Sequence, residues 1–242
     1  MPKNFLAQLV LVGSLILSGS GTWAQNVEKA VLLQLHSRVL GSSRLLFNKN
    51  GMRLELDQTR VVVAMKAPAW NVQCWKPSKK IYYEGEASEW RPRLAIFTAL
   101  FRPTDTGSLR VASSKPDTLN GIVARKYELV SPDSDKNGPQ SWRGLLLRNG
   151  AYWLIDDKQI PESVTTVIQR TYGIPVVPGI PLELRATTNK GSAREELRFI
   201  SKSTKPVSSA DFEVPPGFRR VKELEDVTND PDVNNGFSEF IR

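Results

Sequence analysis

Hydrophobic and polar residues alternate along most of the chain, as they do in β-strands that bury one face. The clearest stretch is Met52-Arg53-Leu54-Glu55-Leu56, which follows an apolar run at 44–47 and the pair Asn50-Gly51. An Asn-Gly pair between two such runs is typical of a tight hairpin. Turn residues separate the other runs, which predict strands at 60–66, 70–75, 79–84, 109–112, 122–130, 181–188 and 194–203. The pattern therefore predicts a large antiparallel sheet.

A second Asn-Gly pair, Asn149-Gly150, lies between apolar runs at 142–147 and 151–155. By the same reasoning it predicts a second hairpin of the same kind. The segment at 131–140 is polar and has no apolar anchor, which is typical of a surface loop.

Helices are predicted in three segments. Apolar residues spaced like one face of a helix predict a helix at 27–38. The segment 162–172 has a proline before it, a glutamate in its first turn and a glycine after it, which are typical helix boundaries. The segment 93–101, between two prolines, fits either a strand or a helical face, and we predict a short helix there. These helices are expected to cover part of the sheet.

The first 24 residues resemble a secretory signal peptide. Lys3 precedes an apolar run from Phe5 to Leu17, and small residues lead to Ala24. The run is shorter than the roughly 20 apolar residues that cross a bilayer, so we predict cleavage after Ala24 and a periplasmic or secreted protein. The rest divides into one predicted β domain at 25–221 and an acidic, mobile tail at 222–242.

Charge is distributed unevenly. The chain carries 33 Lys and Arg against 25 Asp and Glu, a formal net charge of +8. The predicted tail at 222–242 has a net charge of −4, which leaves about +11 on the body at 25–221. Such a surface would favour an anionic membrane surface or an acidic envelope protein, although it also keeps a protein soluble. No nucleic-acid partner is expected, because no basic cluster is dense enough.

The residues argue against most catalytic chemistry. The chain has one histidine, His36, and one cysteine, Cys74, and it has no phosphate-binding loop or metal motif. We therefore expect a protein that is not an enzyme, with no catalytic residue, cofactor or metal. His36 is expected on the surface of the first helix. Cys74 would share a strand face with Trp70 and Val72, which predicts a buried, inert thiol.

Several longer motifs resemble one exported family. They are NKNGMRLEL, VVVAMKAPAWNVQCWKP, KKIYYE, NGIVARKYEL, VIQRTYGIPVVPGIPLELR and DFEVPPGFRRV, and they span about 40–220. Together they resemble the LolA-like lipoprotein carriers, with segments at 67–70 and 172–181 that look more like the uncharacterised branches. The resemblance implies a mainly β (α+β) fold, in which two or three helices cap a curved, unclosed antiparallel half-barrel. It also implies an apolar hollow that shelters lipid tails.

Strand alternation indicates which side chains face that hollow. The candidates from the strands and the two longer helices are Leu35, Val61, Val63, Met65, Trp70, Val72, Ile81, Tyr83 and Val167. They predict a non-catalytic binding or carrier protein for a lipid, a lipoprotein acyl chain or another hydrophobic ligand. The alternative is that the helices fill the sheet completely. The protein would then be an envelope interaction or sensor module that acts through its basic surface.

Overall fold

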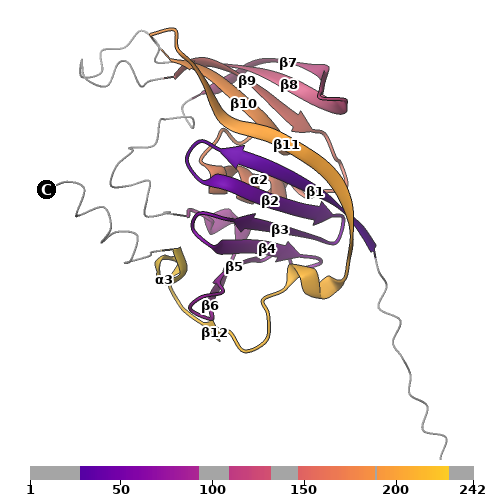
Figure 1. Ribbon diagram of the computed structural model, residues 1–242, viewed down its shortest axis with the longest axis vertical. Coiled ribbons are helices and arrows are strands. Elements are labelled where there is room, and N and C mark those ends of the chain that lie inside the picture. The colour runs from indigo at the N-terminus through magenta and orange to yellow at the C-terminus, as the bar shows by residue number, and fades with distance from the viewer. Residues whose placement is uncertain (1–27, 93–108, 132–146, 189, 229–242) are drawn as a thin grey trace, which may run out of the picture.

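The computed structural model describes residues 28–92, 109–131, 147–188 and 190–228, and their strands form a single curved sheet (Figure 1). The strands are β1 (Glu28–Ser37), β2 (Gly41–Asn48), β3 (Gly51–Leu56), β4 (Val61–Lys66), β5 (Val72–Lys76), β6 (Ile81–Gly85), β7 (Arg110–Leu119), β8 (Ile122–Val130), β9 (Leu147–Ile155), β10 (Ile180–Thr188), β11 (Ala193–Val207) and β12 (Arg219–Arg220). The helical elements are η1 (Ala87–Glu89), α2 (Glu162–Tyr172), η3 (Ser209–Phe212) and α3 (Leu224–Thr228).

The sheet has the order β12-β6-β5-β4-β3-β2-β1-β11-β10-β9-β8-β7. Neighbours pair antiparallel, except that β12 runs parallel to β6. The long-range pairing of β1 with β11, from Glu28 opposite Val207 to Ser37 opposite Leu197, joins the two halves of the chain. β7 and β12 remain as edges, so the sheet is curved but unclosed. The predicted antiparallel half-barrel is confirmed.

The first predicted hairpin is confirmed. β2 and β3 pair with Asn48 opposite Gly51, so the turn residues are Lys49 and Asn50, one position earlier than predicted. The Asn48 side chain holds this turn, because its Oδ1 atom accepts hydrogen bonds from the backbone N–H groups of Asn50 (2.9 Å) and Gly51 (3.0 Å). The predicted strands from 60 to 84 are present as β4, β5 and β6.

The helix predicted at 27–38 is wrong, because this segment is the strand β1. β1 lies between β2 and β11 and packs on both faces of the sheet. Leu33 and Leu35 join the cluster on one face, while Ala30 joins the cluster on the other. A strand that is buried on both faces has apolar residues at many spacings, and these can match a helical pattern by coincidence. His36 therefore lies on a strand rather than on a helix surface.

The second predicted hairpin is also wrong. β9 runs straight through Asn149-Gly150, and Gly150 lies opposite Leu129 of β8 and Ala186 of β10. A Cβ atom at Gly150 would lie 3.0 Å from the carbonyl oxygen of Arg185. This glycine therefore permits a close approach of two strands instead of a turn. Five predicted segments lie wholly or largely outside the described residues: the signal peptide, the helix at 93–101, the loop at 131–140, the strand start at 142–146 and the tail from 229 to 242.

The predicted helix at 162–172 is confirmed as α2. Pro161 precedes it, and Gly173 ends it in the left-handed conformation with φ of 66°, which a glycine adopts without steric cost. The buried residues of α2 include Val164, Val167 and Ile168, which pack against the concave face of the sheet. α2 lies on the far side of the sheet in Figure 1.

A C-terminal strap, residues 208–221, crosses the convex face. Phe212 in η3 packs with Ala30, Leu46 and Val207, while Val214 and Phe218 pack against a second cluster that contains Trp75. The strap then pairs with β6 through β12. The chain continues into α3, where Val227 is buried with the concave cluster. Thus residues 224–228, which the sequence assigns to a mobile tail, are folded.

Candidate ligand-binding face

The nine predicted lining residues come together on the concave face. Leu35, Val61, Val63, Met65, Val72, Ile81 and Val167 are buried in one cluster, and Trp70 and Tyr83 are partly buried against it. Leu35 reaches this face from β1 rather than from a helix. Each strand alternates as expected, because Val61 and Val63 face the concave cluster while Val62 faces the convex one.

Most of the candidate side chains on this face are tightly packed among the described residues. Met65, Val72 and Val167 have no exposed surface, and Leu35 and Val63 are 1% exposed. Side chains so fully buried leave no water-sized space beside them. A ligand on this face would therefore have to replace contacts that the protein makes with itself.

Polar contacts near the C-terminal end of α2, the helix that caps the concave face, fix its position. The Gln169 side chain donates from Nε2 to the carbonyl oxygens of Val177 (2.7 Å) and Gly179 (2.8 Å), and its Oε1 accepts from the Val177 N–H (2.7 Å). The Trp90 indole donates to the Thr171 hydroxyl (2.9 Å). The Gln169 side chain is fully buried, and its bonds tie α2 to the connection that leads into β10.

Three tyrosine hydroxyls lie beneath the cap, and they differ in their partners. Tyr172 shares a 2.7 Å hydrogen bond with Ser43, and Tyr127 donates to the carbonyl oxygen of Pro178 at 3.4 Å. The Tyr152 hydroxyl is fully buried and has no hydrogen-bond partner among the described residues. Burial raises the pKa of both Tyr152 and Tyr172, since it disfavours the charged phenolate, and the hydrogen bond with Ser43 offsets part of the rise at Tyr172.

This difference predicts opposite effects for two matched substitutions. Tyr152→Phe removes a buried hydroxyl without a partner, so it should raise the free energy of unfolding by about 1 kcal/mol. Tyr172→Phe breaks a buried hydrogen bond and should lower it by about 1 kcal/mol. Urea unfolding monitored by circular dichroism measures both changes. Equal effects of the two substitutions would contradict the assignment of the partners.

Cys74 is buried on the concave face, as predicted, and it forms no disulfide. Burial raises the pKa of its thiol far above the usual value, so the reactive thiolate is strongly disfavoured. In the described part of the chain, no group of three or more His, Cys, Asp and Glu side chains is placed to hold a metal ion. The thiol is thus part of the packed cluster.

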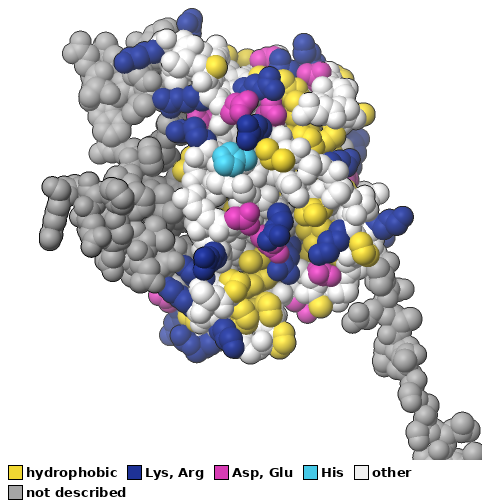
Figure 2. All heavy atoms as spheres, in the orientation of Figure 1, with side chains coloured by type: hydrophobic (Ala, Val, Ile, Leu, Met, Phe, Trp, Pro, Cys, Tyr) yellow, Lys and Arg dark blue, Asp and Glu magenta, His cyan; other side chains and the backbone are white. Residues whose placement is uncertain are grey.

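Charged side chains are spread over the whole convex face. Figure 2 shows this face, on which Lys and Arg side chains are spread from end to end around the only histidine. Some are neutralised locally, since Glu55 pairs with both Arg44 and Arg53 at 2.8 Å. Basic residues also gather beside β12, where Arg219 donates its backbone N–H to the carbonyl oxygen of Lys80 (2.9 Å).

Among the helices of the described ranges, none is long and apolar enough to cross a membrane.

Protein-family models and curated protein sequences give no match to this chain. Solved structures give matches at low identity. A LolA superfamily protein from Nitrosomonas europaea is 9% identical with a TM-score of 0.23, over 79% of this chain and 91% of that one. An uncharacterized conserved protein from Thermus thermophilus is 11% identical with a TM-score of 0.33, over 80% and 90%. A chain of the MucA/MucB complex of Pseudomonas aeruginosa is 12% identical with a TM-score of 0.33, over 80% and 58%.

The structure is a curved, unclosed antiparallel half-barrel. The unclosed antiparallel sheet and the helix on its concave face are the architecture that the sequence motifs imply. The chain also has two features that the sequence did not indicate: the strap over the convex face, and a cavity beside the strap. Neither has a local sequence signal, because each depends on residues far apart in the chain.

Proposed function

We propose that this protein is exported and binds a lipid, a lipoprotein acyl chain or another hydrophobic ligand between its concave face and α2, without covalent chemistry. The observation that supports the proposal is the continuous apolar cluster under a single eleven-residue helix. An acyl chain would replace the side chains that α2 now places against the sheet, so binding would lift or shift this helix. The predicted signal peptide would deliver the protein to the periplasm or the medium.

A brominated fatty acid provides a direct test of the ligand and its location. Bromine quenches the fluorescence of a nearby tryptophan, and Trp90 lies in the concave cluster whereas Trp75 lies in a convex one. We expect bromostearate, but not stearate, to quench the fluorescence in a saturable titration. Trp90→Phe should lower this quenching, and the remainder should come from Trp70 and Trp153, which also belong to or pack against the concave cluster. If lipid vesicles and free fatty acids neither quench nor compete, the proposed function is wrong.

A matched pair on α2 tests whether the covered face does the binding. Val167 is fully buried, whereas Thr166 is only partly buried on the same helix. Val167→Asp places a charge against the apolar face and should weaken bromostearate binding about tenfold or more. Thr166→Asp adds the same charge outside the cluster and should leave binding unchanged. Circular dichroism checks that each variant is folded. If Val167→Asp is unfolded, the change in quenching in the Trp90→Phe variant still tests whether the ligand lies on the concave face.

The basic surface supports a second candidate, an envelope interaction or sensor module that captures an anionic membrane surface or an acidic protein. The specific observation is the exposed group of Lys80, Arg219 and Arg220 around β12, although Arg220 also pairs with Glu84 at 3.6 Å. Exposed charge contacts are screened over about 8–10 Å. Capture that disappears at high salt, together with no response to bromostearate, would favour this candidate over the first.

A further inference from the structure

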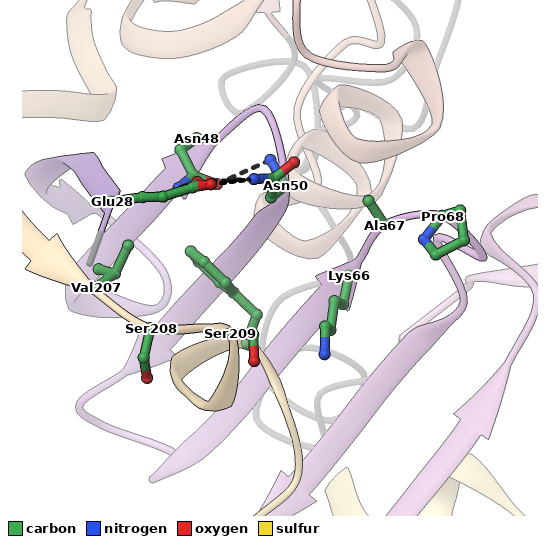
Figure 3. A pocket seen from close by; sticks show the side chains of 10 residues that line it. Glu28, Asn48, Asn50, Lys66, Ala67, Pro68, Val207, Ser208 and Ser209 are labelled. Atoms are coloured by element: carbon green, nitrogen blue, oxygen red, sulfur yellow. Dashed lines mark hydrogen bonds between the residues drawn. The ribbon is translucent and has the colours of Figure 1, made fainter. Parts of the chain in front are cut away.

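A cavity of about 410 Å³ opens on the convex side at the far end of the β2–β3 hairpin (Figure 3). Its walls come from the start of β1, the β2–β3 turn, the segment after β4 and the strap. None of the nine predicted lining residues contributes to it. The cavity is therefore separate from the concave face, and a ligand could occupy it whether or not that face binds a lipid.

The centre of this cavity is a carboxylate that neutral donors hold in place. Asn50 donates from Nδ2 to both carboxylate oxygens of Glu28, at 2.8 and 2.7 Å, and Asn48 donates from Nδ2 to one of them at 3.2 Å. The Asn48 side chain is itself fixed by the turn that it caps. A carboxylate has about four acceptor positions, so at least one remains for another donor.

No Lys or Arg among the described residues forms an ion pair with Glu28. Lys66 also lines the cavity, but its ammonium group pairs with Glu213. In Figure 3 the amino group of Lys66 points away from Glu28, whose carboxylate faces Asn48 and Asn50. The Glu28 charge is thus oriented but not balanced by a described cation. Both oxygens of Glu28 act as acceptors here, whereas a side-chain amide would offer one acceptor oxygen and an NH2 donor.

The remaining walls are suited to a short apolar group. Ala67, Pro68, Val207 and Phe212 line the cavity, and the hydroxyl residues Ser208 and Ser209 lie at its edge. A cationic group next to Glu28 would therefore have hydrocarbon beside it. An ammonium ion with three N–H donors suits the unused acceptor positions of the carboxylate better than a quaternary ammonium, which has none.

We propose that this cavity binds a primary ammonium group on a short apolar stem, with Glu28 as its counter-ion. The same chemistry occurs in a free alkylamine and in an ethanolamine headgroup. The probe is n-butylammonium, titrated into the full mature chain while backbone amide chemical shifts are recorded by NMR. We expect saturable shifts at Asn50, Gly51 and Ser209, much smaller shifts with n-butanol, and weaker binding of butyltrimethylammonium.

Variants of Glu28 decide between a binding site and a structural network. Glu28→Gln keeps a hydrogen-bond acceptor but removes the charge, so it should weaken n-butylammonium binding about tenfold or more. Glu84→Gln, at an exposed charge pair on β6, should leave binding unchanged. If Glu28→Gln proves unfolded, Glu28→Asp tests the same charge at a shorter reach and should bind more weakly than the wild type. Glycerophosphoethanolamine then distinguishes a headgroup, which should compete, from a site restricted to free amines.

Three results would overturn the proposal: no saturable shifts with n-butylammonium, equal shifts with n-butanol, or unchanged affinity in a folded Glu28→Gln variant. Each of them would leave only the structural network at the β2–β3 turn. Bromostearate binding is measured on the same samples. Because the two sites share no lining residue, loss of one response without the other separates this proposal from the proposed function.

Discussion

Replacing Phe212 with alanine is expected to lower the free energy of unfolding by about 3–5 kcal/mol, the usual cost of removing a large buried aromatic side chain. Phe212 is 2% exposed, and it packs with Ala30, Leu46 and Val207 on the convex face. It is the main apolar contact between η3 and the sheet. Equilibrium unfolding in urea, followed by tryptophan fluorescence, measures the change.

Gly51 provides a coupled control for this prediction. A Cβ atom at Gly51 would lie 2.3 Å from Cγ of Phe212, so Gly51→Ala should cost about 1–3 kcal/mol through overpacking. In the Phe212→Ala background the added methyl group has room, and most of that cost should disappear. The two substitutions should therefore be non-additive in a double-mutant cycle. Additivity within about 0.5 kcal/mol would mean that Phe212 does not pack on the hairpin.

Local patterns were sufficient for most of the sheet because its strands bury one face and are joined by short turns. The alternation at 52–56 and the glycine after α2 each identify their element without knowledge of the rest of the chain. The prediction was wrong where tertiary contacts change the meaning of a pattern. The first half of β1 has apolar residues on both faces because Phe212 covers Ala30 on the convex side, and Gly150 meets a neighbouring strand instead of making a turn.

The candidate face was predicted better than its surroundings. Alternate residues of a strand face opposite sides of the sheet, so the sequence alone placed Val61, Val63 and Met65 together on the concave side. The cavity around Glu28 had no such signal. Its residues come from four separate segments, which the pairing of β1 with β11 and the return of the strap bring together. Contacts between residues so far apart in the chain cannot be predicted from the spacing of residue types in a single sequence.

Alkaline pH is expected to destabilise the protein steeply, because three acidic groups are buried in their neutral forms. Cys74, Tyr152 and Tyr172 are fully or almost fully buried, and burial raises the pKa of each above its ordinary value. In the unfolded chain the thiol loses its proton near pH 8.5 and the phenols near pH 10. Above those values the unfolded state binds fewer protons than the folded state, so stability falls as the pH rises. Below about pH 8 the contribution of these groups to stability is fully present.

Each group should contribute up to about 1.4 kcal/mol per pH unit, which gives a slope of about 4 kcal/mol per pH unit once all three have passed their unfolded pKa. Urea unfolding at several pH values between neutrality and about pH 11 measures this slope. The variant Cys74→Ala/Tyr152→Phe/Tyr172→Phe removes all three groups and should lose stability much less steeply over the same range. A smaller slope should remain, because burial also raises the pKa of Tyr83 and Tyr127. The neutral-pH stability of the variant serves as the reference, so a general loss of packing does not affect the comparison. If the variant lost stability as steeply as the wild type, the buried thiol and phenols would not be the cause, and charge repulsion elsewhere on the protein would have to account for the unfolding.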